Sequence, residues 1–414
     1  MVNLPDHRHE VPPTAGLPLR WRDFFAGTTE TLEDGLASLL DVPAVQIECS
    51  GTAALIVILT TLKRASARRS VIIPAYTCPL VVLAIAHCNL TPVLCDVSKD
   101  RFDLCPRSLE RLISDDTLAI IPTHLGGRIA DLSAVIDIAR RKGALIIEDA
   151  AQALGATWQG RAAGTVGDAG FFSLAVGKGL TLYEGGVLVA RDEGLRQALK
   201  VTSEQIVPYL LFREVQRLTQ LAGYWALYRP AALRFSYGMP LRRALRKGNL
   251  IGAVGDDFGA NIPVHRVGAW RRSIGANALT RLPAFLFMLA DQAAARMERL
   301  RMIEGLTVID DPANSRGTWP FLMVLMPTAR ARDAALARLW TAGMGVSRLF
   351  IHALPDYPYL AARLGSADVP NARDFAARML TISNSPWMEA SDFDCICSAL
   401  EAALDASAHF SQPA

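Results

Sequence analysis

The sequence predicts an α/β fold in which a mostly parallel sheet carries helices on both faces, followed by a smaller C-terminal α+β domain. Two observations favour this fold. Between residues 45 and 190, short apolar runs alternate with longer helical patterns, which is typical of strands joined by crossover helices. Hydrophobic residues make up 51% of the 414 residues, so the chain can bury a large core and is not disordered.

The strands of the large domain are predicted from buried-looking apolar runs, the second of which ends at Pro74 and the third at Asp96. These strands are expected at residues 45–49, 70–73, 91–95, 118–122, 144–149 and 187–190. The helices between them are expected at about 30–40, 50–62, 76–87, 108–113 and 131–142. Because strands and helices alternate in this way, the sheet should be mainly parallel.

The C-terminal region contains fewer predicted elements. Its helices are expected at 282–304, 330–342 and 390–406, and its strands at 317–326, 345–351 and 379–383. We therefore divide the chain into four segments. They are an N-terminal arm (1–30), a large domain (31–204), a helical insertion (205–265) and a small domain with its connecting long helix (266–414).

The insertion 205–265 mixes aromatic stretches, such as Tyr224-Trp-Ala-Leu-Tyr, with basic ones around Arg242 and Arg246. One interpretation is a lid or a helix that contacts a membrane surface. The alternative, which we favour, is a helical segment packed on the domain or at a subunit contact.

Composition excludes several classes of protein. A formal net charge of +3 does not argue for nucleic-acid binding. The seven cysteines are an odd number without paired spacing, which favours free thiols in a reducing compartment. Cys395 and Cys397 are too close for a usual zinc pair, so no metal site is expected. The polar start is not a signal peptide, and prolines interrupt the apolar stretch 71–95. We expect a cytoplasmic protein.

A candidate reactive site comes from one lysine and one aspartate. Lys178 lies between two glycines after an apolar run, and such surroundings lower the pKa of an amine. Asp149 ends a buried strand, where open α/β sheets bind ligands. An uncharged lysine opposite an aspartate is the pair that pyridoxal phosphate (PLP) requires. The alternative for Lys178 is an ordinary surface lysine on a turn.

A second candidate feature follows the first strand, where Ser50-Gly51-Thr52-Ala53-Ala54 opens a helix. Free backbone amides and the helix dipole favour a phosphate there. The alternative is an ordinary helix start capped by Ser50 or Thr52. No GxGxxG motif opens the first strand–helix unit, which disfavours a nicotinamide enzyme.

Taken together and in order, several motifs resemble the DegT/DnrJ/EryC1/StrS aminotransferases, which are fold-type-I PLP enzymes. The resemblance covers about residues 40–405. The motifs are Gly51-Thr-Ala-Ala-Leu55, Glu148-Asp-Ala-Ala-Gln152, Gly167-Asp168, Phe172-Ser173 and Lys178-Gly-Leu-Thr-Leu-Tyr-Glu-Gly-Gly186. It implies that residues 31–204 form the PLP-binding domain.

The resemblance also implies roles for single residues. Lys178 holds PLP as an imine and moves the proton, and Asp149 pairs with the pyridine nitrogen. Gln152 contacts the ring hydroxyl. Ser173 holds the phosphate together with the helix start at Gly51, Thr52 and Ala53. Asn277 reaches the phosphate of a neighbouring subunit, which implies a homodimer with shared sites. The alternative for Asn277 is an ordinary asparagine on a turn.

Three positions depart from the family pattern, and all three bear on the substrate pocket. Cys78 stands where an aromatic residue usually stacks on the ring, with Tyr76 and His124 as alternatives. Gly126 replaces a usual tyrosine, and Leu279 a usual arginine, although Arg281 is near.

The function that the resemblance implies is transamination. Glutamate or glutamine would donate an amino group to a keto group on a sugar-like or cyclitol-like acceptor. One alternative is another PLP reaction such as a sugar dehydration, although the related dehydratases carry histidine in place of the lysine. The other is a non-catalytic regulator that kept the fold.

Overall fold

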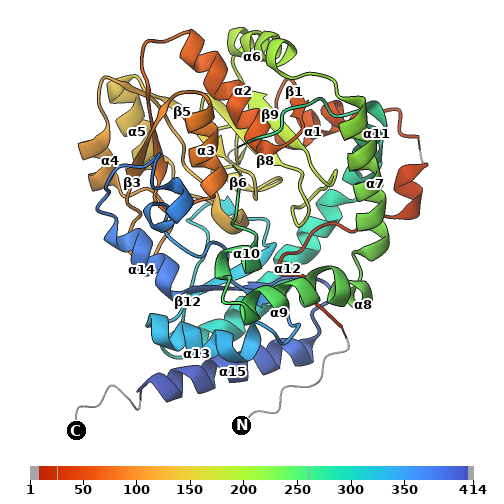
Figure 1. The fold of residues 1–414 in the computed structure, drawn as a ribbon, viewed down its shortest axis with the longest axis vertical. Coiled ribbons are helices and arrows are strands. Elements are labelled where there is room, and N and C mark those ends of the chain that lie inside the picture. Colours follow the sequence, from red (N-terminus) through yellow and green to blue (C-terminus); the bar gives the residue numbers. More distant parts are fainter. Residues whose placement is uncertain (1–8, 26, 260, 409–414) are drawn as a thin grey trace.

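A seven-stranded sheet forms the centre of the larger part of the molecule (Figure 1). The computed structural model describes residues 9–25, 27–259 and 261–408. The strand order is β1-β9-β8-β5-β4-β2-β3. The strands span Val45–Glu48 (β1), Ser70–Pro74 (β2), Thr91–Cys95 (β3), Thr117–Ile120 (β4), Leu145–Asp149 (β5), Ala169–Ser173 (β8) and Gly186–Ala190 (β9). The pairs from β3 through β8 are parallel, whereas β9 runs antiparallel to both β8 and β1.

Helices cover both faces of this sheet, as the sequence predicted. Successive strand residues point to opposite faces, so Ile72 and Ile120 pack against one set of helices and Val71 and Ala119 against another. The first set is α4 (Pro106–Leu112) and α5 (Ser133–Lys142). The second includes α1 (Leu32–Leu40), α2 (Gly51–Arg64) and α3 (Pro79–His87). Helix α6 (Glu193–Ile206) lies beside α2.

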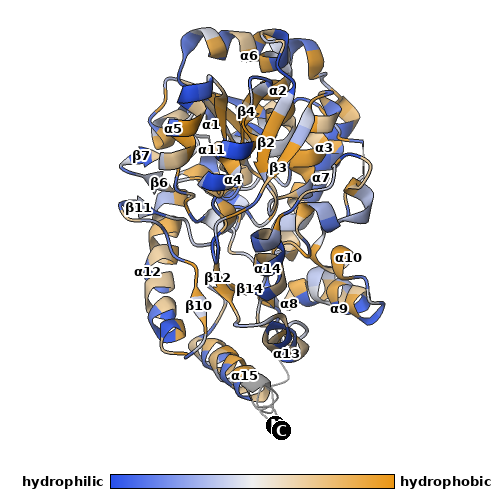
Figure 2. Ribbon diagram, turned by 90° about the vertical axis from the view of Figure 1, so that its left-hand side faces the viewer, coloured by the Kyte–Doolittle hydropathy of each residue, from blue (hydrophilic) through white to orange (hydrophobic). Residues whose placement is uncertain are grey.

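The smaller part contains a four-stranded antiparallel sheet with its own core. Its order is β10-β12-β14-β13, with strands Thr307–Val308, Phe321–Leu325, Met379–Ser383 and Val346–Ser347. The helices around it are α13 (Ala329–Leu339), α14 (Pro370–Arg378) and α15 (Ala390–Ala408). Figure 2 shows the long helix α12 (Leu282–Arg301) running along one side of the molecule between the two parts. A third, small sheet joins β6 (Thr157–Trp158) to β7 (Arg161–Ala162) and β11 (Ser315–Arg316).

The predicted strand at 345–351 is wrong beyond its first residues. Strand β13 covers only Val346–Ser347, and the chain then turns into a buried loop. The guanidinium of Arg348 stabilises this loop by donating to the carbonyls of Ile351 and Ala376. Two short 3-10 turns, Leu354–Asp356 and Pro358–Leu360, complete the loop.

The N-terminal arm contacts the loop that carries Lys178. A 3-10 turn, η1, spans Trp21–Phe24. Ala15 and Leu17 are buried in the main core, and the N–H of Leu17 donates to the carbonyl of Gly179 at 2.9 Å. The start of the arm, residues 1–8, lies outside the described residues.

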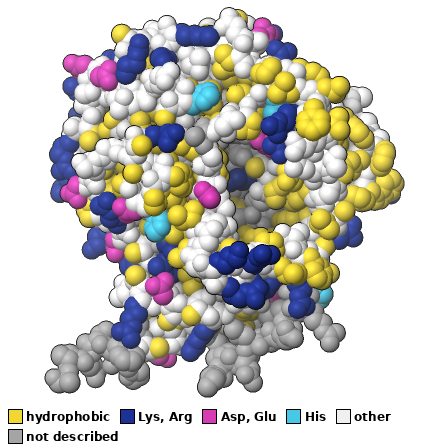
Figure 3. Space-filling model, viewed as in Figure 1, with side chains coloured by type: hydrophobic (Ala, Val, Ile, Leu, Met, Phe, Trp, Pro, Cys, Tyr) yellow, Lys and Arg dark blue, Asp and Glu magenta, His cyan; other side chains and the backbone are white. Residues whose placement is uncertain are grey.

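The insertion 205–265 packs on both parts of the molecule. Helix α7 (Leu211–Leu227) buries Leu221 and Tyr224 in the main core, beside α11 (Ala269–Leu279) in Figure 1. The short helices α9 (Met239–Arg246) and α10 (Leu250–Val254) pack on the smaller core. Helix α8 (Pro230–Leu233) and a π-helical turn, η3 (Arg234–Gly238), connect α7 to α9. In Figure 3, basic side chains gather over α9 and apolar ones over α7.

The four-segment division of the chain stays a prediction. Among the described residues, no single helix is long and apolar enough to cross a membrane, although the bent pair α11 and α12 meets that test together.

Candidate active site

A cavity of about 590 Å³ lies at the carboxyl ends of the central strands. Thr123 and His124 follow β4, Asp149 ends β5 and Ser173 ends β8, and all four line the cavity. Parallel strands place such residues at one edge of a sheet, where open α/β folds bind ligands. A cavity of this size accommodates a small organic molecule. The face drawn in Figure 3 is hollowed above α9.

Lys178 and Asp149 line this same cavity. Burial lowers the pKa of the Lys178 amine below its ordinary value, so the uncharged form becomes more accessible. Burial raises the pKa of Asp149 to about 6, while the N–H of Ala151 and the charge on Lys178 partly oppose the shift. The N–H of Ala151 donates to Oδ1 of Asp149 at 3.0 Å. The cavity is thus lined both by an amine with a lowered pKa, that of Lys178, and by the buried carboxyl of Asp149.

The first turn of α2 borders the cavity through Gly51 and Thr52. Ser50 caps the helix, because its Oγ accepts the N–H of Ala53 at 3.0 Å. Helix hydrogen bonding begins at the N–H of Ala54, so the N–H groups of Gly51 and Thr52 point out of the helix end. Such groups bind anions. Ala53 itself is buried and does not line the cavity.

The end of β8 lies directly against this helix start. A Cβ atom on Gly51 would lie 3.3 Å from both Cβ of Ser173 and the carbonyl oxygen of Phe172. A side chain at position 51 would force these neighbours to move by a few tenths of an ångström, whereas glycine fits without a shift. Ser173 and the start of α2 therefore line adjacent parts of the cavity.

Two further predicted residues, Gln152 and Cys78, line the cavity. Oε1 of Gln152 accepts the N–H of Gly126 at 2.8 Å, so the Nε2 amide is its remaining donor. Burial raises the pKa of the Cys78 thiol to about 12, which keeps it uncharged. A neutral thiol is a small apolar group here, not a nucleophile.

Of the two alternatives for an aromatic cover, Tyr76 lies outside the cavity and His124 borders it. Tyr76 is buried between Phe350 and Phe375, and its hydroxyl donates to the carbonyl of Phe350 at 3.2 Å. His124 borders the cavity next to Thr123, but its ring is completely buried.

Asn277, the predicted contact to a neighbouring subunit, does not line the cavity of its own chain. Its Nδ2 donates to the backbone carbonyl of Asp23 at 2.8 Å. The nearby Arg281 pairs with the Asp23 carboxylate at 2.6 Å and donates to the carbonyl of Pro18. Both side chains thus hold the N-terminal arm.

The sequence prediction missed a segment of the insertion that lines the cavity. We call residues 254–259 and 261–263 the strap; it includes Val254, Asp256, Phe258, Ile262 and Pro263. From Val254, the last residue of α10, the strap leads towards α11 without further regular secondary structure. The lack of any periodicity is the reason that no sequence pattern indicated its position.

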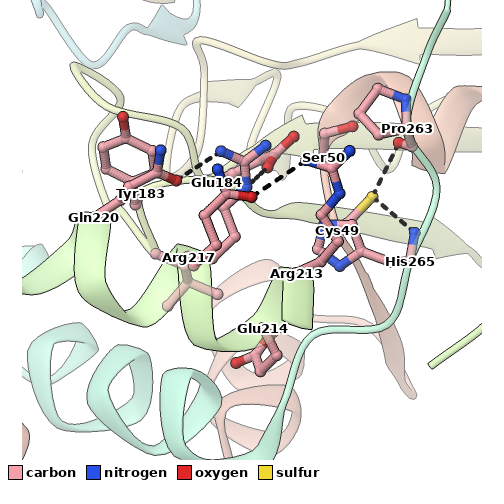
Figure 4. A network of polar contacts seen from close by, with 12 residues as sticks. Cys49, Ser50, Tyr183, Glu184, Arg213, Glu214, Arg217, Gln220, Pro263 and His265 are labelled. Atoms are coloured by element: carbon pink, nitrogen blue, oxygen red, sulfur yellow. Dashed lines mark hydrogen bonds and ion pairs between the residues drawn. The ribbon is translucent and has the colours of Figure 1, made fainter. Parts of the chain in front are cut away.

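Polar contacts fix the end of the strap beside α2 (Figure 4). Sγ of Cys49 donates to the carbonyl of Pro263 at 3.5 Å and accepts the N–H of His265 at 3.4 Å. Figure 4 also shows Glu184, which lines the cavity, paired with Arg217 of α7. The insertion therefore contacts the site through both the strap and α7.

Within the described part of the chain, no group of three or more His, Cys, Asp or Glu residues is placed to hold a metal ion.

Comparisons with known proteins agree with this geometry. A putative L-glutamine:3-amino-2,3-dideoxy-scyllo-inosose aminotransferase of Micromonospora echinospora is 44% identical over 132 residues, which cover 32% of each protein. A GDP-perosamine synthase of Caulobacter vibrioides is 38% identical over 135 residues, covering 33% of this chain and 36% of that protein. The matches thus span about a third of the length of these curated relatives.

A solved structure and a family model extend the similarity to most of the chain. A putative sugar aminotransferase from Streptococcus pneumoniae in its PMP-form superposes with a TM-score of 0.74 and 19% identity. The superposition covers 96% of this chain and 100% of that one, and it shows the shared fold. The sequence model of the DegT/DnrJ/EryC1/StrS aminotransferase family matches residues 21–401. The chain therefore belongs to the DegT/DnrJ/EryC1/StrS aminotransferase family.

Proposed function

We propose that this protein is a PLP-dependent aminotransferase that moves an amino group from glutamate or glutamine to a keto group on a sugar or cyclitol. The observation that carries the proposal is that Lys178 and Asp149 line one cavity beside the first turn of α2. Family membership supports it. The names of relatives that act on a cyclitol and on a nucleotide-linked sugar suggest the two acceptor classes.

The residues of the cavity fit PLP. When bound, this cofactor supplies an aldehyde for an amine and a ring that accepts electrons. The N–H groups of Gly51 and Thr52 and the Ser173 hydroxyl would bind its phosphate, because Ser173 and the start of α2 line adjacent parts of the cavity. Because residue 51 is a glycine, no side chain of its own fills the space next to Ser173.

The other polar residues of the cavity would bind the cofactor ring and transfer protons. Nζ of Lys178, in its uncharged form, would attach the cofactor and later take the proton from the substrate carbon. The Asp149 carboxylate would hold a proton on the ring nitrogen. Nε2 of Gln152 would donate to the ring hydroxyl, since its Oε1 is already occupied by Gly126. The strap would exclude water from the site.

We further propose a homodimer in which Asn277 contributes to the site of the partner subunit. Large apolar side chains around η1 and the start of α7 support an interface on this side, because they are exposed. They are Trp21 (59% exposed), Phe25 (78%), Phe212 (80%) and Trp270 (54%). Sedimentation velocity should give the mass of two chains. Asn277→Ala should then weaken PLP binding without separating the chains.

The test of the proposed activity begins with the visible absorbance of the protein loaded with PLP. Glutamine or glutamate should bleach the band of the Lys178-bound cofactor, and a keto-cyclitol or keto-sugar should restore it. Lys178→Ala should abolish this band. Lys200→Ala is the matched control, because Lys200 is exposed and should leave the band unchanged.

Two alternative outcomes would redirect the proposal. A coloured protein that no amino donor bleaches would indicate another PLP reaction, such as a sugar dehydration, although Lys178 favours transamination. A protein that takes up no PLP would indicate a non-catalytic regulator. The cytoplasmic location also stays a prediction.

A further inference from the structure

Asp256 is a buried carboxylate of the cavity wall that the mechanism above does not use. It belongs to the strap and is only 3% exposed. The preceding helix, α10, packs with α9 on the smaller core, and Figure 1 shows it in that part of the molecule. The strap therefore brings a charge to the cavity that the sheet and α2 do not supply.

The two oxygens of Asp256 have different surroundings. Oδ2 accepts the hydroxyl of Tyr357 at 2.6 Å and the N–H of Ile351 at 3.0 Å. Oδ1 has no hydrogen-bond partner among the described residues. Oδ1 is not among the fully enclosed polar atoms that lack a partner, so it is open to the cavity that Asp256 lines. Since Asp256 lines the cavity, a ligand there can supply the missing donor.

The other charges on the cavity wall limit what this ligand can be. Of the described residues that line the cavity, Asp149, Glu184 and Asp256 carry carboxylates, whereas Lys178 is the one lysine or arginine. Glu184 is already paired with Arg217. Arginine and lysine are the side chains that most often bind the phosphates of a nucleoside diphosphate. The wall of this chain instead offers acceptors for hydroxyl and ammonium groups.

A purely structural role for Asp256 is the competing explanation. Its carboxylate holds the loop at 351–357, and its backbone carbonyl accepts the hydroxyl of Tyr359. Those contacts occupy Oδ2 and the main chain. They leave Oδ1 available to accept a hydrogen bond from a molecule in the cavity.

We propose that Asp256 binds a hydroxyl or ammonium group of the keto acceptor, and that this acceptor is a polyhydroxylated ring ketone without a phosphate or nucleotide. The inference rests on the proposed aminotransferase function. It makes Asp256 a specificity-determining residue that contacts substrate through Oδ1.

The test measures binding to the enzyme in its pyridoxamine phosphate form, using probes that lack a keto group. The probes are scyllo-inositol for the hydroxyl arm, scyllo-inosamine for the ammonium arm, and uridine diphosphate. Calorimetry should show at least one cyclitol binding more tightly than uridine diphosphate. Asp256→Asn should raise the dissociation constant for that cyclitol about tenfold or more, because it removes a charged hydrogen-bond acceptor.

Two further variants distinguish a direct contact between Asp256 and the acceptor from an effect of Asp256 on folding. Asp257→Asn is the matched control, since Asp257 is exposed and lies outside the cavity wall; it should bind as the unaltered protein does. Tyr357→Phe removes a donor to Oδ2 but keeps the charge. If Asp256 contacts the acceptor, this variant should weaken cyclitol binding less than Asp256→Asn does.

The inference is overturned if uridine diphosphate binds most tightly, or if Asp256→Asn binds both cyclitols as Asp257→Asn does. It is also overturned if Tyr357→Phe reproduces the full loss. Bleaching of the PLP band by glutamine or glutamate needs no acceptor. If an amino donor bleaches the PLP band but the cyclitol-binding test fails, only the assignment of the acceptor is wrong. If no amino donor bleaches the band, the proposed aminotransferase function itself is wrong.

Discussion

Nε2 of His124 lies 2.9 Å from Oε2 of Glu148, and both side chains are completely buried. Nδ1 of His124 accepts the N–H of Ala130 at 3.1 Å, so the ring carries its proton on Nε2 and donates it to Glu148. Three backbone N–H groups, those of Gly164, Val166 and Gly167, also donate to Glu148. One carboxylate thus orients the buried ring of His124 and anchors the loop at 164–167.

Glu148→Gln should destabilise the protein by about 3 kcal/mol, because an amide group would face N–H donors where a carboxylate oxygen now accepts. Urea unfolding of the cofactor-free protein measures this loss. Glu110→Gln is the control, since Glu110 forms an exposed ion pair with Arg141 and should change stability little. Equal losses in the two variants would contradict the role of Glu148.

Asp149→Asn should stabilise the cofactor-free protein near pH 7 while impairing turnover. Burial raises the folded-state pKa of Asp149 to about 6 from an ordinary value of 3.8. A group with a raised folded-state pKa favours folding fully below its ordinary pKa of 3.8, where it is protonated. This contribution to folding stability is lost as pH rises through 6, because the buried carboxyl must then ionise. At pH 7 the ionised carboxylate costs the folded state about 3 kcal/mol.

The stabilisation by Asp149→Asn should therefore shrink as pH falls from 6 to 4, because Asp149 becomes protonated, and it should vanish below pH 4. Thermal unfolding of the cofactor-free variants across this range checks the sign. Asp115→Asn provides the control, because the side chain of Asp115 is 98% exposed. A stabilisation that grows on acidification would show that burial is not the cause of the shift.

Gly51→Ala should raise the dissociation constant for PLP about tenfold or more, since its Cβ would crowd Ser173 and the carbonyl of Phe172 at 3.3 Å. Fluorescence titration of the cofactor-free protein with PLP measures the effect. Gly223→Ala is a matched change within α7 that meets nothing within 4 Å. It should leave PLP affinity unchanged, and an equal loss in both variants would refute a phosphate site at Gly51.

The sequence predicted the sheet and one group of site residues because both follow local rules. Apolar runs mark six of the seven strands, but β8, which ends at Ser173, was not among the predicted strands. The strand ends bring Asp149 and Ser173 to one edge. The chemistry of Lys178 also follows from its neighbours. Strand alternation places Glu148 and Asp149 on opposite sides, but the hydrogen bonds of Glu148 to His124 and to the loop at 164–167 depend on tertiary packing.

Contacts between distant segments were not predictable from the sequence. Asp256 joins Cys78 on one cavity wall although 178 residues separate them, and the strap has no periodic pattern to indicate this. Tyr76 and His124 were equal alternatives for a cover on the ring. Only the structure shows that Tyr76 belongs to the core with Phe350 and Phe375.

The buried pair of Arg271 and Glu214 connects the insertion to the loop after Lys178. Nε and Nη2 of Arg271 donate to Oε1 and Oε2 of Glu214 at 2.9 and 2.6 Å, and Nη1 donates to the carbonyl of Glu184 at 2.7 Å. Burial opposes ionisation of Glu214, but its hydrogen bonds with Arg271 prevail and lower the pKa of the carboxyl. Its contribution to stability is therefore present near neutral pH and is lost on acidification.

Glu214→Ala should cost about 3–5 kcal/mol at neutral pH, because it leaves the Arg271 guanidinium buried without a counter-charge. The double variant with Arg271→Ala should lose less than the sum of the two single losses, since it removes both charges. Urea unfolding gives these free energies, and PLP titration should show weaker binding as the loop at Glu184 loosens. Additive losses of stability with unchanged PLP affinity would mean that α7 packs on the domain without supporting the site. The comparison of the two single variants with the double variant therefore decides whether the insertion supports the site.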